Sequence, residues 1–299
     1  MNANLYALIE AHFPREREVP CILVPDGPVV HYDDLTALSS RIAHALVRAG
    51  CRPGDRVAVQ ADKHWQVLAL YLGCLRAGLV YLPLNTAYQK HELAFFFDDA
   101  KPRVIVCRPE ALGTVATLAG DATVLVLDAN GGEVADRASR EDATFETVTS
   151  GPDDLAAILY TSGTTGRAKG AMLTHRNLAS NALALVDAWG FTRGDAVLHA
   201  LPIYHVHGLF VAVHCALLSG ARRWNIRLDA SLRPDITVAI RMDQDNKAVL
   251  DYYLLPRSSQ RPGCLRLREE NGLSLDGFRY ETLGAFFYLA SRIPLRRTA

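Results

Sequence analysis

LAAILYTSGTTGRAKGAMLTHRN, residues 155–177, is the stretch that decides how the sequence is interpreted. Residues 155–160 form a short and almost unbroken apolar run, which is the pattern of a buried strand. Residues 170–173, Gly-Ala-Met-Leu, follow a lysine and predict a second strand rather than the start of a helix. The stretch therefore predicts two strands joined by a loop that is rich in glycine and in hydroxyl side chains.

The loop between these strands has the chemistry of an anion-binding site. Its glycines let the backbone turn tightly and direct N–H groups into the loop. The hydroxyl side chains add donors, and the lysine supplies a mobile positive charge. Because the loop contains donors and cations but no acid, we expect it to bind a polyanion through Thr161, Ser162, Gly163, Thr164, Thr165, Gly166 and Lys169.

Two other interpretations of the loop compete with a phosphate site. A Walker A loop is excluded, because the spacing G-x-x-x-x-G-K-[ST] is absent and a strand follows the lysine. On composition alone, a solvated hairpin loop of turn-forming residues is an equal alternative. The whole string LYTSGTTGRAKGAMLTHRN favours the phosphate site, because it closely resembles the phosphate-binding signature of the adenylate-forming enzymes. These include acyl-CoA synthetases, adenylation domains of peptide synthetases and luciferases.

The resemblance extends over the first two thirds of the chain, from about residue 30 to about residue 221. GCRPGDRVAVQ, YLGCLRAGLVYLPLN and KHELAFFFDDAKPRVIV are similar, in this order, to segments of the family's N-terminal subdomain. The resemblance implies that residues 161–169 hold the β- and γ-phosphates of ATP with the help of Mg²⁺. It also implies that Lys169 is catalytic and that CoA is the second substrate.

Length and composition are those of an ordinary globular protein. The chain has 299 residues, of which 49% are hydrophobic and 21% charged, enough for two domains with cores. The net charge of +0 argues against nucleic acid or an anionic membrane surface as a partner. No apolar run approaches the ~18 residues that would span a bilayer.

Cysteine usage and the N-terminus favour a cytoplasmic protein. The six cysteines are scattered without a C-x-x-C pair, so neither a zinc site nor a disulfide framework is predicted. The N-terminal sequence MNANLYALIEAHF lacks the basic and apolar regions of a secretory signal.

Apolar periodicity predicts an α/β fold with a mostly parallel sheet flanked by helices, equivalent to an incomplete adenylate-forming fold. Strands are expected at residues 56–60, 79–82, 103–107, 123–127 and 196–201, and helices at 34–49, 64–77, 91–99, 111–119 and 208–219. Thr174 is expected to cap a helix after the second strand of the hairpin. Residues 128–154 are polar and acidic and are expected to form an exposed connection. We expect an N-terminal subdomain at 1–150, a phosphate-loop and acyl-pocket segment at 151–221, and a divergent arginine-rich tail at 222–299.

A second segment that contains candidate functional side chains is LPIYHVHGLF, residues 201–210. Pro202 and Gly208 favour a bend from which Tyr204, His205 and His207 project. Two histidines at this spacing are often satisfied core or surface residues, as we expect for His199 and His214. A metal site is not predicted, because no nearby cysteine or carboxylate completes a ligand set.

The resemblance implies that His205 acts beside the substrate carboxylate and that His207 lines the acyl pocket. A histidine at position 207 suits a substrate with a second negative charge, because a histidine can donate hydrogen bonds to a carboxylate. The segments ALPIYHVHGLF and NLASNALALVD are most similar to malonyl-CoA synthetases within the family. Malonate or a close dicarboxylate is therefore the expected acid, and a fatty or aryl acid is the alternative.

The family pattern is expected to stop near residue 221. Residues 1–221 carry 18 Lys+Arg and 23 Asp+Glu, a net charge of −5, which leaves +5 for residues 222–299. The family's adenine-binding aromatic residue, its ribose-binding aspartate and its second lysine are not recognisable there. We hypothesise a frameshifted or rearranged reading beyond about Arg222, with a divergent natural tail as the alternative. The chain could then be an inactive remnant or a nucleotide-binding fragment.

Overall fold

The computed structural model describes residues 2–24, 27–161, 168–193, 196–199 and 201–220, together with the backbone of four later strands. The chain divides into two compact units. The first comprises Met1–Ala11, Asp33–Ser180 and Ile203–Val206, and the second comprises His12–Tyr32, Asn181–Pro202 and His207–Ala299. The subdomain limits expected near residues 150 and 221 stay a prediction.

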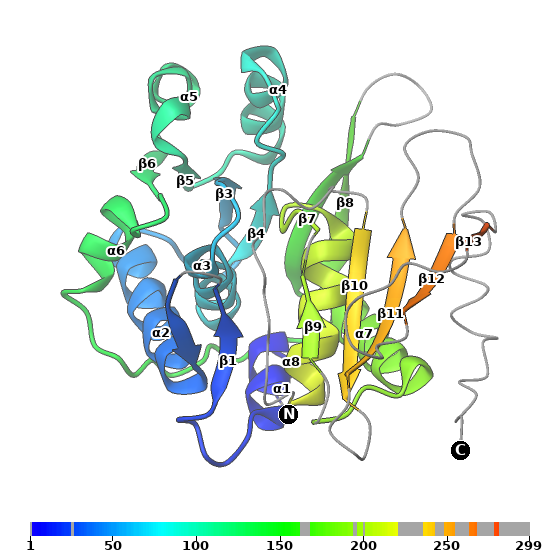
Figure 1. The fold of residues 1–299 in the computed structure, drawn as a ribbon. Coiled ribbons are helices and arrows are strands. Elements are labelled where there is room, and N and C mark those ends of the chain that lie inside the picture. Colours follow the sequence, from blue (N-terminus) through cyan, green and yellow to red (C-terminus); the bar gives the residue numbers. More distant parts are fainter. Residues whose placement is uncertain are drawn as a thin grey trace. The chain divides into compact units, whose positions relative to one another are not determined.

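The first unit is built on a six-stranded sheet in the order β6-β5-β3-β4-β7-β8 (Figure 1). Four of its pairings are parallel, and only β7 and β8 are antiparallel. The strands are β3 (Arg56–Gln60), β4 (Val80–Pro83), β5 (Val104–Cys107), β6 (Thr123–Val126), β7 (Leu155–Thr161) and β8 (Lys169–Thr174). The predicted α/β class and the two strands of the hairpin are confirmed.

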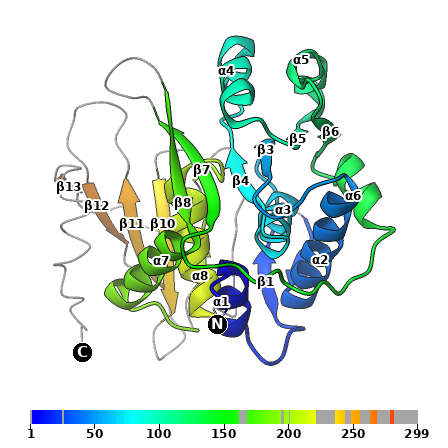
Figure 2. The ribbon, with the colours of Figure 1, turned by 180° about the vertical axis from the view of Figure 1, so that it is seen from behind.

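Helices connect the parallel strands, as the sequence pattern predicted (Figure 2). The connecting helices are α3 (Trp65–Arg76), α4 (Lys90–Ala100), α5 (Leu112–Leu118), which a short 3-10 turn at Pro109–Ala111 precedes, and α6 (Gly132–Ala138). The helices α1 (Leu5–His12) and α2 (Tyr32–Arg48) come before β3 in the chain, and α7 (His175–Trp189) follows β8. The ends of α4 have local causes. The backbone N–H of Gln89 donates to Glu92 Oε2 (2.8 Å) at the start, and Lys101 adopts a left-handed conformation (φ 48°) at the end.

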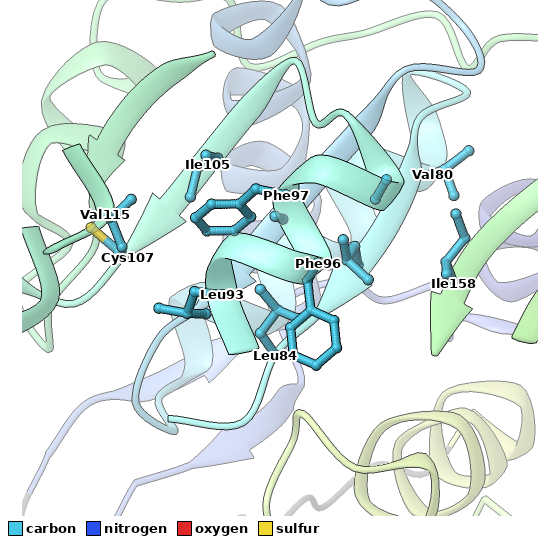
Figure 3. Packing of buried hydrophobic residues seen from close by; sticks show 12 residues of the cluster. Val80, Leu84, Leu93, Phe96, Phe97, Ile105, Cys107, Val115 and Ile158 are labelled. Atoms are coloured by element: carbon cyan, nitrogen blue, oxygen red, sulfur yellow. The ribbon is translucent and has the colours of Figure 1, made fainter. Parts of the chain in front are cut away.

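The core beside the hairpin lies between α4 and the sheet (Figure 3). Phe96 and Phe97 of α4 belong to the same cluster of buried side chains as Ile105 of β5 and Ile158 of β7. Burial of an aliphatic or aromatic side chain of this size contributes roughly 1.5–3 kcal/mol. Strand β7, which leads into the predicted phosphate loop, is therefore held by apolar packing in its middle.

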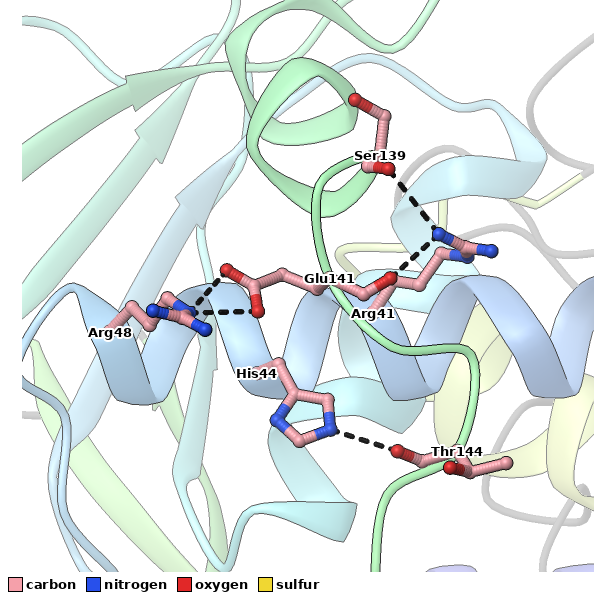
Figure 4. Close-up of polar contacts among 6 residues, drawn as sticks. All are labelled: Arg41, His44, Arg48, Ser139, Glu141 and Thr144. Atoms are coloured by element: carbon pink, nitrogen blue, oxygen red, sulfur yellow. Dashed lines mark hydrogen bonds and ion pairs between the residues drawn. The ribbon is translucent and has the colours of Figure 1, made fainter.

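The prediction for residues 128–154 was wrong in part, because the segment contains α6 and is tied to α2. The Arg48 Nε atom lies 2.6 Å from Glu141 Oε1, and the His44 ring nitrogen Nε2 lies 2.8 Å from the carbonyl oxygen of Thr144 (Figure 4). These contacts use polar atoms of both partners. The polar and acidic composition of residues 128–154 therefore could not show whether the segment packs on a helix or extends into solvent.

The second unit contains a hairpin of β1 (Pro20–Leu23) and β2 (Val29–His31) and an antiparallel sheet in the order β13-β12-β11-β10-β9. This sheet comprises β9 (Ala196–Leu198), β10 (Ile236–Met242), β11 (Ala248–Leu254), β12 (Gly263–Leu267) and β13 (Phe278–Tyr280). The strand predicted at 196–201 is shorter than expected, because a bend and turns follow from Leu201. The helix predicted at 208–219 is a π-helix (His207–Val213) followed by α8 (His214–Ser219).

Candidate nucleotide and acyl site

The β7–β8 hairpin closes the predicted phosphate loop. Thr161 pairs with Lys169 and Tyr160 pairs with Gly170 in the antiparallel register, so both ends of the loop leave the sheet at one place. The side chains of Thr161 and Lys169 are exposed. The other loop residues named in the prediction, Ser162, Gly163, Thr164, Thr165 and Gly166, lie outside the described residues.

The loop follows the carboxyl end of β7, a strand parallel to β4. In open α/β sheets, ligands bind beyond the carboxyl ends of the parallel strands. The loop therefore begins at the edge of the sheet where a nucleotide is expected, and its lysine is exposed.

Gly170 of β8 lies close to two side chains of β7. A Cβ atom there would lie 3.1 Å from Ile158 Cγ2 and 3.3 Å from Tyr160 Cε1. These contacts are tighter than ordinary van der Waals separation. The aromatic ring of Tyr160 therefore lies against the backbone of β8 directly beside Lys169.

Thr174 caps the helix that follows the hairpin, as predicted. The backbone N–H of Asn177 donates to Thr174 Oγ1 (3.1 Å), and the backbone N–H of Thr174 donates to Asn177 Oδ1 (3.1 Å). His175 is buried, and its Nδ1 atom accepts a hydrogen bond from the backbone N–H of Leu5 (3.0 Å). Burial lowers the pKa of the His175 imidazole, while Asp154 acts in the opposite direction. Strands β7 and β8 are the two stems of the loop. The second stem, β8, thus continues into a helix whose first residue is hydrogen-bonded to the backbone of α1.

The two histidines predicted for the acyl site follow β9 in the chain and belong to different units. His205 belongs to the first unit, and His207 is the first residue of the π-helix in the second unit. His205 is exposed as a whole, yet partial desolvation lowers the pKa of its imidazole. That His205, His207 and Lys169 face one substrate stays a prediction.

Gly208 shapes the bend of this segment within the second unit. A Cβ atom at this position would lie 2.1 Å from the carbonyl oxygen of Pro202, so only glycine fits the approach of the two backbones. The Nε2 atom of buried His199 forms a hydrogen bond with the carbonyl oxygen of Gly208 (2.9 Å). His214 is also fully buried, which lowers its pKa to about 3. Both histidines therefore have the burial expected of structural residues.

Two residues that the sequence analysis did not single out lie beside the loop, namely Tyr160 and Asp99. Tyr160 was interpreted only as the end of an apolar strand, and Asp99 only as a residue of a helix. The Tyr160 hydroxyl donates a hydrogen bond to Asp99 Oδ2 (2.5 Å). An aromatic residue with a polar tip at a strand end is the sequence signal that could have identified the pair.

The residues that the structure describes contain no group of three or more His, Cys, Asp or Glu side chains able to hold a metal ion. Within the same residues, no helix combines the length and the apolar character needed to cross a membrane.

Comparison with known proteins identifies similar sequences and similar folds. A family described as AMP-binding enzyme matches residues 11–241. The match runs past residue 221, where the resemblance was expected to stop, and reaches into β10. The crystal structure of ATP-bound MatB from Rhodopseudomonas palustris is 49% identical in sequence, with a TM-score of 0.71, and the match covers 74% of this chain and 44% of that one.

Curated relatives are also matched over part of their length. A mitochondrial malonate–CoA ligase of Mus musculus is 33% identical over 240 residues, which cover 74% of this chain and 41% of the relative. A feruloyl-CoA synthase of an Amycolatopsis species is 36% identical over 194 residues, which cover 65% of this chain and 38% of the relative. The chain thus spans less than half the length of these relatives.

Proposed function

Because the chain belongs to the AMP-binding enzyme family, we propose that it acts as an AMP-forming acid–thiol ligase that uses ATP and CoA. The observation that carries this proposal is the hairpin that joins Thr161 to Lys169 beyond the carboxyl end of β7. The sequence between these two residues is rich in backbone and hydroxyl donors, and its one charged side chain, Arg167, is basic. This chemistry suits the β- and γ-phosphates of ATP.

The proposed reaction has two steps. The carboxylate of the acid attacks the α-phosphate of ATP, so that the bond to pyrophosphate breaks and an acyl-adenylate forms. The thiol of CoA, with loss of its proton, then attacks the acyl carbon and displaces AMP. In phosphoryl transfer, catalysis is mostly positioning and neutralisation of charge. Lys169 would neutralise the leaving pyrophosphate, and His205 would donate a hydrogen bond to the attacking carboxylate.

Mg²⁺ would supply further neutralisation of the phosphates when bound. Its usual ligands are carboxylate and phosphate oxygens and water. The described residues contain no group of three or more candidate side chains, so they fit only a metal held largely by the nucleotide. The described residues of this chain therefore contribute to the triphosphate mainly through Lys169 and Thr161.

We propose malonate or a close dicarboxylate as the acid. His207 would donate a hydrogen bond to the second carboxylate of such a substrate, which a purely apolar acid cannot accept at that position. The similarity to MatB and to a malonate–CoA ligase supports this choice. The similarity to a feruloyl-CoA synthase supports the second candidate, an aryl or fatty acid.

An inactive remnant or nucleotide-binding fragment is the candidate of a different class. It would bind ATP weakly or not at all and would show no exchange reaction with any acid. The cellular setting that we propose for either candidate is the cytoplasm. The cysteines whose side chains are described are all buried thiols, in keeping with a reducing compartment: Cys21, Cys51, Cys74, Cys107 and Cys215.

The experiment that tests the proposal is malonate-dependent ATP–pyrophosphate exchange by the purified 299-residue chain. Exchange that requires malonate would support the ligase, and exchange that prefers benzoate or a long-chain acid would support the second candidate. A folded preparation without exchange for any acid would contradict catalysis by this chain. Binding of ATP would then distinguish a nucleotide-binding fragment from a remnant.

A further inference from the structure

Tyr160 links helix α4 to the hairpin that carries the predicted phosphate loop. Its hydroxyl donates to Asp99 Oδ2 at 2.5 Å, between residues 61 positions apart in the sequence. Asp99 is exposed near the end of α4, and Tyr160 is half-buried near the end of β7. The bond is therefore a tertiary contact made at the base of the loop.

The ring of Tyr160 reinforces this link through contacts with two elements. Its centroid lies 4.4 Å from that of Phe96 of α4, with an interplanar angle of 36°. The same ring approaches Gly170 of β8, where a Cβ atom would lie 3.4 Å from Tyr160 Cζ. Tyr160 thus packs against α4 and against the second stem of the loop at the same time.

Phe96 of α4 also contacts a second aromatic ring. Tyr88 lies just before α4, and its ring centroid is 4.9 Å from that of Phe96. Phe96 is buried and so has a defined place in the core. The ring of Tyr160 therefore rests on a fixed surface rather than on a mobile side chain.

The hydrogen bond is of the charge-assisted kind. Burial raises the pKa of Tyr160, and the hydrogen bond to Asp99 and the charge of Asp99 raise it further. The hydroxyl therefore keeps its proton and stays a donor to the carboxylate at neutral pH. Charge-assisted bonds are shorter and roughly twice as strong as neutral ones.

We propose that Asp99 and Tyr160 are positioning residues for the phosphate-binding loop, because together they fix the direction in which both stems leave the sheet. The next pair beyond Tyr160 and Gly170 is Thr161 and Lys169. A change in the stem would therefore move the lysine relative to the phosphates of ATP. That the loop binds ATP rests on the proposed function. That Asp99 and Tyr160 hold the hairpin in place rests on the contacts of the hairpin alone.

The test compares Tyr160→Phe and Asp99→Ala with Asp98→Ala as the matched control. Asp98 neighbours Asp99 on the same helix and is exposed, but it pairs with Lys101 at 2.5 Å instead of with the hairpin. Asp99→Asn keeps an acceptor for the Tyr160 hydroxyl and should restore part of any loss.

The first readout is amide hydrogen exchange of residues 158–161 and 169–172 without nucleotide. Faster exchange at these positions in Tyr160→Phe and Asp99→Ala, but not in Asp98→Ala, is the expected result. Exchange equal to that of the unchanged protein in both variants would overturn the proposal, whether or not the chain is a ligase.

The second readout is the KM for ATP in ATP–pyrophosphate exchange. We expect the two variants to raise it about tenfold, with a smaller effect on the KM for the acid. Equal increases in both KM values, or the same increase in Asp98→Ala, would mean that the pair only stabilises the fold. If the unchanged chain shows no exchange reaction, the proposed function fails, while amide exchange still decides the mechanical part.

Discussion

Thr161 of β7 and Lys169 of β8 pair with each other, and this pair ends the antiparallel ladder between the two strands. Both side chains are exposed, so neither contributes to the core beneath the hairpin. Strand β7 is held by apolar packing, with Ala156 and Ala157 fully buried. Stability and the proposed ligand chemistry therefore depend on different residues of one hairpin, and they can be changed separately.

Lys169→Ala should remove activity while leaving the fold intact. Loss of a cation that neutralises the leaving pyrophosphate should lower the rate of ATP–pyrophosphate exchange about 10²–10³-fold. Because Lys169 is exposed, the free energy of unfolding should change by no more than about 0.5 kcal/mol. Lys90→Ala, an exposed lysine at the start of α4, is the control and should keep full exchange. An active Lys169→Ala variant would contradict the assigned role.

His207→Leu should change the preference among acids rather than the chemistry. The variant loses a donor to the second carboxylate and gains an apolar surface. We expect kcat/KM for malonate to fall about tenfold or more relative to that for a monocarboxylate of similar size. His91→Leu, which changes an exposed histidine of α4, is the control. Equal losses for both acids in His207→Leu would argue against a role in specificity.

Arg76→Met should destabilise the first unit strongly. The guanidinium of this buried residue donates to the Tyr6 hydroxyl (2.9 Å), to Ser39 Oγ (3.1 Å) and to the carbonyl oxygen of Phe145 (2.9 Å). It also stacks on the Tyr6 ring at 4.4 Å. Removing these donors leaves buried acceptors unpaired, so the free energy of unfolding should fall by about 2–4 kcal/mol. Urea denaturation measures the change.

The control for Arg76→Met is Arg137→Met, because Arg137 is exposed and pairs with Glu133 one turn away on α6. An exposed pair of this kind contributes little, and the expected loss is about 0.5 kcal/mol or less. Similar losses in both variants would contradict the view that Arg76 joins α1, α2 and the chain around Phe145.

Periodicity and one motif were sufficient to predict the sheet, its hairpin and the cap at Thr174, because these features depend on neighbours in sequence. The anchoring of Glu141 on α2 and the bond between Asp99 and Tyr160 were not predictable in the same way. Both join polar residues far apart in the chain, and their sequence signals match those of solvated residues. The left-handed Lys101 at the end of α4 was likewise hidden, because glycine is the usual signal for that conformation.

Acid should destabilise the first unit through His175. Its Nδ1 atom accepts the backbone N–H of Leu5 at 3.0 Å, and protonation would replace this acceptor with a donor. Burial lowers the folded pKa below the usual value, so the unfolded chain binds more protons once the pH falls below about 6.5. The stabilisation is thus fully present above that pH. It is lost as the pH falls toward the folded pKa, at up to about 1.4 kcal/mol per pH unit for one group.

The measurement is urea denaturation of the unchanged chain and of His175→Gln between pH 7.5 and 5. The variant should be less stable at pH 7.5, and its stability should fall less steeply toward acid. Some slope should persist, because burial also lowers the pKa of His64 and lowers that of His214 to about 3. His91→Gln, the same substitution at an exposed histidine of α4, is the control. A slope in His175→Gln equal to that of the unchanged chain would show that His175 protonates equally well in the folded and unfolded states.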